Sequence, residues 1–136
     1  MTYSIHNLSK KQLQVIQDAT ELLLRVQLGQ WHRIMDHLPL KEDIDYNNLH
    51  GTTDLIARLL SNFMDHNIDG VSSSLSIGNE NLPESTTIAV DIHDVIRHDL
   101  SWENANEKRL TDTSGVNYDK PFHWSGEPLP VIEKTS

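Results

Sequence analysis

The fold is decided by residues 9–39, which read SKKQLQVIQDATELLLRVQLGQWHRIMDHLP. Ser9 and Gln12 have the spacing of a capping box, in which two residues satisfy each other's free backbone N–H groups at the start of a helix. Apolar residues then recur at helical intervals as far as Pro39. They are Leu13, Ile16, Leu23, Trp31, Ile34, Met35 and Leu38. The pattern predicts one long helix over about residues 10–37.

Apolar side chains cover most of the circumference of this predicted helix. The polar residues fall in one narrow stripe, formed by Gln14, Asp18, Glu21, Arg25, His32 and Asp36. A helix this apolar is expected to be buried, and we expect a homo-oligomer to bury it. Gly29 lies inside it at a cost of about 1 kcal/mol relative to Ala, which indicates close helix packing or the approach of a ligand to the backbone. Gln30 lies in the apolar sector, where its amide needs hydrogen-bond partners.

Two more helices are predicted by the same periodicity, over about residues 47–65 and 83–102. Pro83 suits the first turn of the last helix, because its fixed φ is already helical. The segment 67–80 between them is rich in Gly, Ser and Asn, with the spacing of a short, weak strand in residues 71–77. The order of the serine-rich loop around Ser72 is left open by the sequence.

The C-terminal residues, about 112–136, are polar and rich in turn residues, which predicts an extended arm or a short hairpin. The arm carries the aromatic residues Tyr118, Phe122 and Trp124. We expect these rings to close the arm onto its own helices, with a groove on a neighbouring subunit or partner as the alternative. The chain is thus predicted to be a single, mainly α domain of three helices over residues 1–136, with little β structure.

The chain has 136 residues, with 20 Asp and Glu against 11 Lys and Arg, and its formal net charge is −9. This charge repels phosphate backbones and excludes non-specific nucleic-acid binding through the general surface. The mean hydropathy is −0.48 and the apolar runs are short, so we expect no membrane partner. The absence of cysteine excludes disulfides and thiolate metal sites. The N-terminus has no basic stretch leading into an apolar run, so we expect a cytoplasmic protein.

The third predicted helix carries most of the residues capable of chemistry. Asp91, Asp94 and His98 stand at i, i+3 and i+7, which places them within roughly 60° of one helical face. This set suits a hard divalent ion, especially if His32 and Asp36 face it, and it defines one alternative function, a metal-dependent hydrolase. A solvated acidic face explains the same spacing without a metal.

Two further residues of this helix depart from a simple pattern. Arg97 lies beside His93, and its planar guanidinium suits a phosphate or carboxylate, although a surface ion pair with Asp94 explains it equally well. Asp99 falls in the middle of the apolar face, where an unpaired carboxylate is strongly disfavoured. We therefore expect the helix to end near Asp99, with a cation from another segment or subunit as the alternative.

A search for catalytic motifs finds no Gly-x-Ser-x-Gly nucleophile turn and no Gly-rich phosphate loop. We therefore predict no catalytic residues, no cofactor and, outside the alternative above, no metal.

Residues 21–31, 83–102, 118–121 and 126–130 resemble a widespread group of small, uncharacterised phage and prophage proteins. The matching positions are Arg25, Gly29, Gln30, Arg97, His98, Trp102, Asp119 and Pro121. The chain departs from the group at Asp99, where relatives tend to be basic, and around Ser72, where they tend to carry Asn. If the basic residue of the relatives helps to hold an anion, Asp99 weakens that role in this chain.

The resemblance implies a phage-encoded protein that acts by binding, since small phage proteins of this kind include inhibitors of host defence that sequester nucleotide signals. We therefore expect a non-enzymatic inhibitor of host antiviral defence, in the host cytoplasm, that captures a small anionic nucleotide-type signal or blocks a host immune protein. The residues expected to contact a ligand are Arg25, Gln30, Trp31, Arg97, His98 and Trp102. A structural or interaction protein without a small ligand is the remaining alternative.

Overall fold

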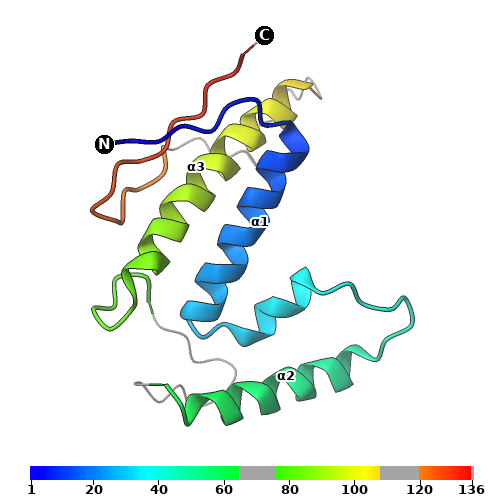
Figure 1. The fold of residues 1–136 in the computed structure, drawn as a ribbon. Coiled ribbons are helices and arrows are strands. Elements are labelled where there is room, and N and C mark those ends of the chain that lie inside the picture. The colour runs from blue at the N-terminus through cyan, green and yellow to red at the C-terminus, as the bar shows by residue number, and fades with distance from the viewer. Residues whose placement is uncertain (65–75, 108–119, 136) are drawn as a thin grey trace. The chain divides into compact units, whose positions relative to one another are not determined.

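The computed structural model describes residues 1–64, 76–107 and 120–135, which are mainly helical (Figure 1). The elements in chain order are the α-helix α1 (Lys10–Gln27), the 3-10 helix η1 (Trp31–His37), and the α-helices α2 (Tyr46–Ser61) and α3 (Glu84–Glu107). No strand occurs in this part of the chain. The mainly α prediction is confirmed, whereas most of the predicted strand at 71–77, with Ser72, and the arm residues Tyr118 and Asp119 lie outside the described residues.

The start of α1 is the capping box predicted from Ser9 and Gln12. The backbone N–H of Ser9 donates to Oε1 of Gln12 over 2.8 Å, and the backbone N–H of Gln12 donates to Oγ of Ser9 over 3.1 Å. Both residues therefore satisfy each other's backbone donors, and α1 begins at Lys10.

The predicted continuous helix to residue 37 is wrong, because α1 ends at Gln27. Gly29 has a φ of 77°, the left-handed conformation that glycine adopts at low cost. The N–H of Gln30 donates to the carbonyl of Arg25 over 2.8 Å, and the N–H of Gly29 donates to the carbonyl of Val26 over 3.1 Å. This pair of bonds is the Schellman motif, so Gly29 ends the helix and is not an interior residue of it. The apolar residues that follow lie in η1.

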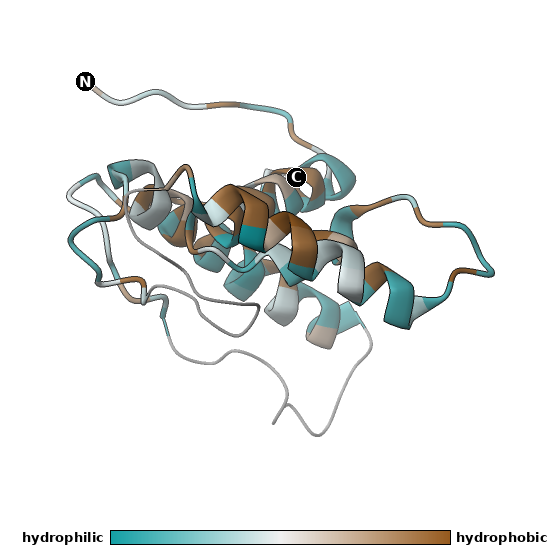
Figure 2. Ribbon diagram, turned by 90° about the horizontal axis from the view of Figure 1, so that it is seen from below, coloured by the Kyte–Doolittle hydropathy of each residue, from teal (hydrophilic) through white to brown (hydrophobic). Residues whose placement is uncertain are grey.

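The helix α2 begins within one residue of its predicted start and ends at Ser61, before the predicted end near residue 65, which lies outside the described residues. Its first turn is capped by Asp45, whose side chain accepts from the backbone N–H groups of Asn47 and Asn48 over 2.9 and 3.4 Å. Seen by hydropathy, α2 carries apolar residues along much of its length (Figure 2).

The helix α3 is longer than predicted and reaches Glu107. The expectation that it ends near Asp99 is therefore wrong. Asp99 lies half-buried inside the helix, and its Oδ2 is buried without a hydrogen-bond partner among the described residues. Helix propensity and packing of the neighbouring apolar residues thus outweigh the cost of placing this carboxylate.

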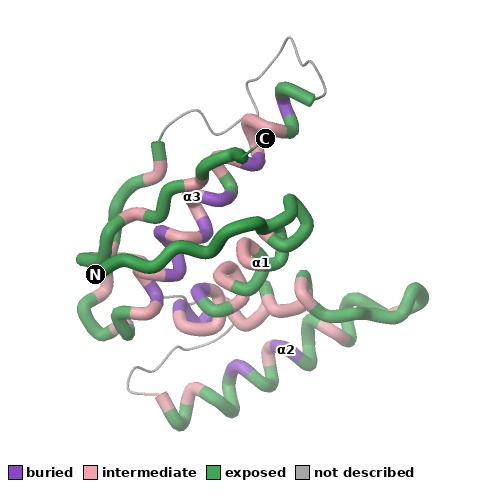
Figure 3. The backbone as a smooth tube through the Cα atoms, turned by 45° about the horizontal axis from the view of Figure 1, so that its top comes forward, coloured by how far each residue is buried: buried purple, intermediate pink, exposed green. Residues whose placement is uncertain are grey.

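The chain divides into two compact units, of which the first comprises Met1–Glu21 and Ile88–Ser136. In it, Nζ of Lys10 lies 2.8 Å from Oδ1 of Asn104 and 3.0 Å from Oε2 of Glu107, so the start of α1 lies beside the end of α3. Buried residues recur along α3 (Figure 3). The apolar ones in this unit are Ala89, Val90, Ile96, Leu100 and Ala105.

The second unit comprises Leu22–Thr87 and contains the end of α1, η1, α2 and the start of α3. The hydroxyl of the fully buried Thr86 donates to Oε1 of Gln27 over 2.7 Å, and Nε2 of Gln27 donates to Oγ of Ser85 over 2.8 Å. These bonds join the end of α1 to the first turn of α3. The buried apolar residues of the unit are Leu24, Leu28 and Ala57.

The expected burial of the first helix is not seen in this single chain. Leu24 is the buried residue of α1, while Val15 is 65% exposed and Leu23 is 42% exposed. None of the described helices is both long and apolar enough to span a bilayer.

Candidate functional site

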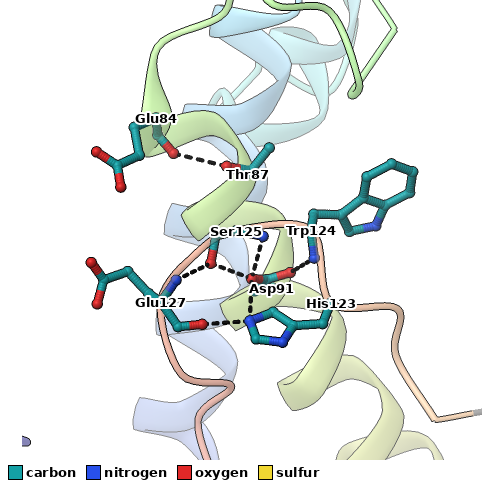
Figure 4. A network of polar contacts seen from close by, with 7 residues as sticks. All are labelled: Glu84, Thr87, Asp91, His123, Trp124, Ser125 and Glu127. Carbon is teal, nitrogen blue, oxygen red and sulfur yellow. Dashed lines mark hydrogen bonds and ion pairs between the residues drawn. The ribbon is translucent and has the colours of Figure 1, made fainter.

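The candidate site is built around Asp91, which is only 2% exposed although it is a carboxylate. The backbone N–H of Trp124 donates to its Oδ1 over 2.8 Å. The backbone N–H and the hydroxyl of Ser125 donate to its Oδ2 over 3.0 and 2.6 Å (Figure 4). A buried carboxylate needs such donors, and charge-assisted hydrogen bonds of this kind are the stronger ones. Asp91 therefore holds residues 124 and 125 against α3.

The arm residues 121–127, here named the aromatic loop, also bond to one another. Oγ of Ser125 accepts from the backbone N–H of Glu127 over 3.2 Å, and Nε2 of His123 contacts the carbonyl oxygen of Glu127. Ser, Gly and Pro in residues 125–128 are turn-forming residues, so the chain bends back here. The loop is thus closed internally by His123 and Ser125 and held on the helix by Asp91.

The electrostatics of Asp91 depend mainly on backbone dipoles. Nε2 of His123 lies 3.8 Å from Oδ2 of Asp91, and the His123 side chain is 44% exposed. This distance is longer than a hydrogen bond, so the three short bonds from Trp124 and Ser125 provide the closest compensation for the carboxylate.

The combination of Ser125, His123 and Asp91 does not have the geometry of a serine hydrolase. In that mechanism the serine hydroxyl donates to a histidine, which removes its proton and is itself oriented by the carboxylate. Here the hydroxyl of Ser125 donates directly to Asp91, and the His123 ring contacts a backbone carbonyl. The cluster holds a loop in place and does not activate a nucleophile.

The aromatic loop presents two rings to solvent. Phe122 is 66% exposed and Trp124 is 40% exposed. Their ring centroids are 4.6 Å apart, with 57° between the ring planes. The expectation that the arm aromatics close the arm onto its own helices is wrong for Phe122, which stays largely exposed, whereas more than half of Trp124 is covered.

The predicted ligand-binding residues fall into two groups, one in each unit. Arg25, Gln30 and Trp31 belong to the second unit. Nη1 of Arg25 donates to Oε1 of Gln30 over 2.5 Å. These two residues occupy the C3 and C″ positions of the Schellman motif, whose side chains commonly contact each other. The amide of Gln30 thus has the partner it needs, and the pairing follows from how α1 ends.

Arg97, His98 and Trp102 belong to the first unit. Nη2 of Arg97 lies 3.4 Å from Oδ1 of Asp94, which also lies 2.9 Å from Nδ1 of His93. The predicted surface ion pair between Arg97 and Asp94 is therefore present. His98 and Trp102 are half-buried, and Nδ1 of His98 is buried with no hydrogen-bond partner in the described part of the chain.

The three carboxylates of the metal hypothesis are already engaged in other contacts, whereas Nδ1 of His32 and Nδ1 of His98 are buried with no hydrogen-bond partner among the described residues. Asp91 accepts from the arm, and Asp94 contacts His93 and Arg97. Asp36 lies in η1, where its Oδ2 is 3.4 Å from Nε of Arg33. Within residues 1–64, 76–107 and 120–135, no group of three or more His, Asp or Glu side chains is placed to hold a metal ion. The metal hypothesis for Asp91, Asp94 and His98 stays a prediction without such a group to support it.

The sequence does not predict the contact between Asp91 and the arm. The spacing along the helix predicts only an acidic stripe for Asp91, and the composition around Ser125 predicts only a turn. Two features of the sequence are consistent with the contact. Asp91 directly follows Val90, which is buried, and the distant arm is rich in turn residues, whose backbone N–H groups are free to donate. Comparisons with known protein families, with curated proteins and with solved structures found no match for this chain.

Proposed function

We propose that this protein is a non-enzymatic binding protein that uses the aromatic loop as its recognition surface. One observation carries the proposal: two adjacent, exposed aromatic rings stand on a loop whose backbone is fixed by the buried carboxylate of Asp91. Aromatic side chains are enriched among the residues that dominate binding energy at protein interfaces. Holding the loop in place lowers the entropy lost on binding.

We further propose that the bound molecule is a host immune protein, and that the protein is a phage-encoded inhibitor of host defence. The resemblance to small phage proteins supports the phage origin. The composition of the loop supports a protein partner, because Phe122 and Trp124 offer apolar area while Glu127 adds a negative charge. A polyphosphate would be repelled by the charge of Glu127 and by the net charge of −9 of the chain.

A small nucleotide-type signal is the second candidate ligand. The Arg25–Gln30 pair supports it, because a half-buried guanidinium held by an amide is a preformed donor for an anion, and Trp31 follows directly in the chain. Since Gln30 already occupies one nitrogen of that guanidinium, we favour the protein partner.

Affinity capture from a bacterial host lysate tests the proposal. The tagged wild-type chain is compared with a Phe122→Ala/Trp124→Ala double variant. Val131→Ala is the matched control, because Val131 is also an apolar arm residue and is 79% exposed. We expect wild type and Val131→Ala to enrich the same protein and the double variant to lose at least about tenfold, as expected for a pair of hot-spot residues.

Equal capture by all three chains would contradict the proposal. A parallel thermal-shift panel of cyclic and ADP-ribose-derived nucleotides separates the second candidate. A shift in the wild-type chain that Arg25→Ala removes and Trp124→Ala leaves intact would replace the protein partner with a nucleotide.

A further inference from the structure

The helix α2 has an apolar face that the described part of the chain leaves uncovered. Its large apolar residues are Leu55, Ile56, Leu59, Leu60 and, in the turn directly after the helix, Phe63. Their exposed fractions are 57%, 45%, 56%, 36% and 88% in that order. The buried residues Thr53 and Ala57 lie on the neighbouring side of the helix, about 100° around its axis from the line of Thr52, Ile56, Leu59 and Phe63. On that side α2 packs against η1 within the second unit, and Leu60 lies at its border.

The spacing along this face is that of a helix-pairing seam. Leu49, Thr52, Ile56, Leu59 and Phe63 follow one another at alternating intervals of three and four residues. This alternation is the a and d pattern of helices that pack at a shallow angle. Leu55 and Leu60 flank the seam, and neither the seam nor these flanks include a charged residue. The absence of charge favours a partner surface that is itself apolar.

We propose that this face binds the same face of a second copy of the chain, with the two α2 helices antiparallel. In that arrangement Ile56 packs against Leu59 of the second copy, and Leu55 and Leu60 flank the seam on its two sides. Thr52, a small residue, lies opposite Phe63, a large one. Every contact then occurs twice about one two-fold axis, as an isologous dimer requires.

A parallel pairing fits the same face less well. Phe63 would lie opposite Phe63 and Thr52 opposite Thr52, which places two large rings at one end and two small side chains at the other. Cores pack best when large and small residues face one another, so the antiparallel register fills the seam more evenly.

The area of the face is sufficient for a dimer. The exposed parts of the five large apolar residues amount to roughly 600 Å² per copy, so two copies would bury on the order of 1,200 Å², the lower end of the range for specific interfaces. The proposal concerns assembly and does not depend on the aromatic loop, whose residues belong to the other unit.

Analytical ultracentrifugation tests the proposal on the full chain at micromolar concentration. We expect the wild-type chain to sediment as two copies of 15.5 kDa. Leu59→Asp should move the dimer–monomer midpoint at least about tenfold higher in concentration, because each charge would be buried against an apolar side chain. Asn47→Asp is the matched control, since it adds the same charge on the polar side of α2, and it should leave the midpoint unchanged.

A monomeric wild-type chain at all concentrations would overturn the proposal, and so would a dimer that Leu59→Asp leaves intact. Cysteine cross-linking tests the register without disturbing the centre of the face, because the chain has no cysteine of its own. Thr52→Cys and Phe63→Cys chains are co-expressed and treated with a short thiol cross-linker.

Antiparallel pairing predicts cross-linked dimers that contain one copy of each variant. Two Thr52→Cys copies would not react with each other, because their thiols lie about 16 Å apart along the helices. Efficient cross-linking of either variant with itself would show parallel pairing and would overturn the proposed register.

Discussion

At the residue scale, the carboxylate of Asp91 determines where the proposed recognition surface lies. It is 2% exposed and accepts from two backbone N–H groups and one hydroxyl of a segment more than thirty residues away in the sequence. Buried polar groups of this kind stabilise only while every partner is present. The position of Phe122 and Trp124 therefore depends on a side chain that bonds to the backbone of the loop.

Asp91→Asn keeps the size of the side chain and removes its charge. The new amide group would face the donors of Ser125, so we expect the free energy of unfolding to fall by about 1–3 kcal/mol. Urea denaturation measures the change. Asp94→Asn is the matched control, because the polar partners of Asp94 among the described residues are His93 and Arg97 of the same helix, and it should cost less than about 1 kcal/mol. Equal losses in both variants would contradict a special role for Asp91.

Substitution of Gly29 and of Gly51 by alanine should change the stability of the chain in opposite directions. Gly29→Ala places a Cβ at a φ of 77°, so we expect a loss of about 1–2 kcal/mol. Gly51 lies inside α2, and a Cβ there meets nothing within 4 Å. Gly51→Ala should therefore increase the free energy of unfolding by about 0.5–1 kcal/mol. Thermal unfolding monitored by circular dichroism reports both, and a Gly29→Ala chain as stable as wild type would refute the assignment of Gly29 to the helix end.

At the element scale, the sequence predicts the start of α1 but not its end. The capping box of Ser9 and Gln12 is local, and its geometry follows directly from the spacing. The end of α1 is not predicted by the pattern, because apolar residues continue at helical intervals into η1 and the periodicity therefore predicts a helix that continues past Gly29. The decisive feature is the φ of one glycine, which a helical pattern tolerates but does not reveal.

The contacts between elements show the same limit. Gln27 and Thr86 bond although they are 59 residues apart, and neither residue has a local signal for the other. Asp91 and the arm are joined in the same way. Helical faces were therefore predictable from sequence, whereas the partner of each face required the structure.

Thr86 provides the test of this contact between elements. Thr86→Val keeps the shape of a fully buried side chain and removes the donor to Oε1 of Gln27. We expect a loss of about 1–2 kcal/mol, because the glutamine oxygen loses its partner. Adding Gln27→Leu should recover part of the loss, since it removes the unpaired group. A double variant whose loss equals the sum of the two single losses, measured in urea, would show that the two side chains are not coupled.

At the scale of the whole molecule, the charge of −9 and the exposed apolar residues act together. Net charge favours solubility, while uncovered apolar faces favour association. We propose binding surfaces on α2 and on the aromatic loop, and not a catalytic centre built from the many carboxylates. The first helix was the expected oligomer interface, and the exposed face of α2 is now the stronger candidate.

The response to metal ions separates this account from the hydrolase alternative. Because Asp91 and Asp94 are occupied by protein donors, we expect the melting temperature to be the same with EDTA, Mn²⁺ or Zn²⁺. Differential scanning fluorimetry with the full chain measures this. A shift of several degrees on chelation or metal addition would favour the hydrolase.

Amide hydrogen exchange measures whether Asp91 fixes the aromatic loop. In the wild-type chain the N–H groups of Trp124 and Ser125 should exchange slowly, because both donate to a buried carboxylate. In Asp91→Asn the same two amides should exchange much faster, while amides in the centre of α3 keep their protection. Rapid exchange of both amides in the wild-type chain would contradict the account.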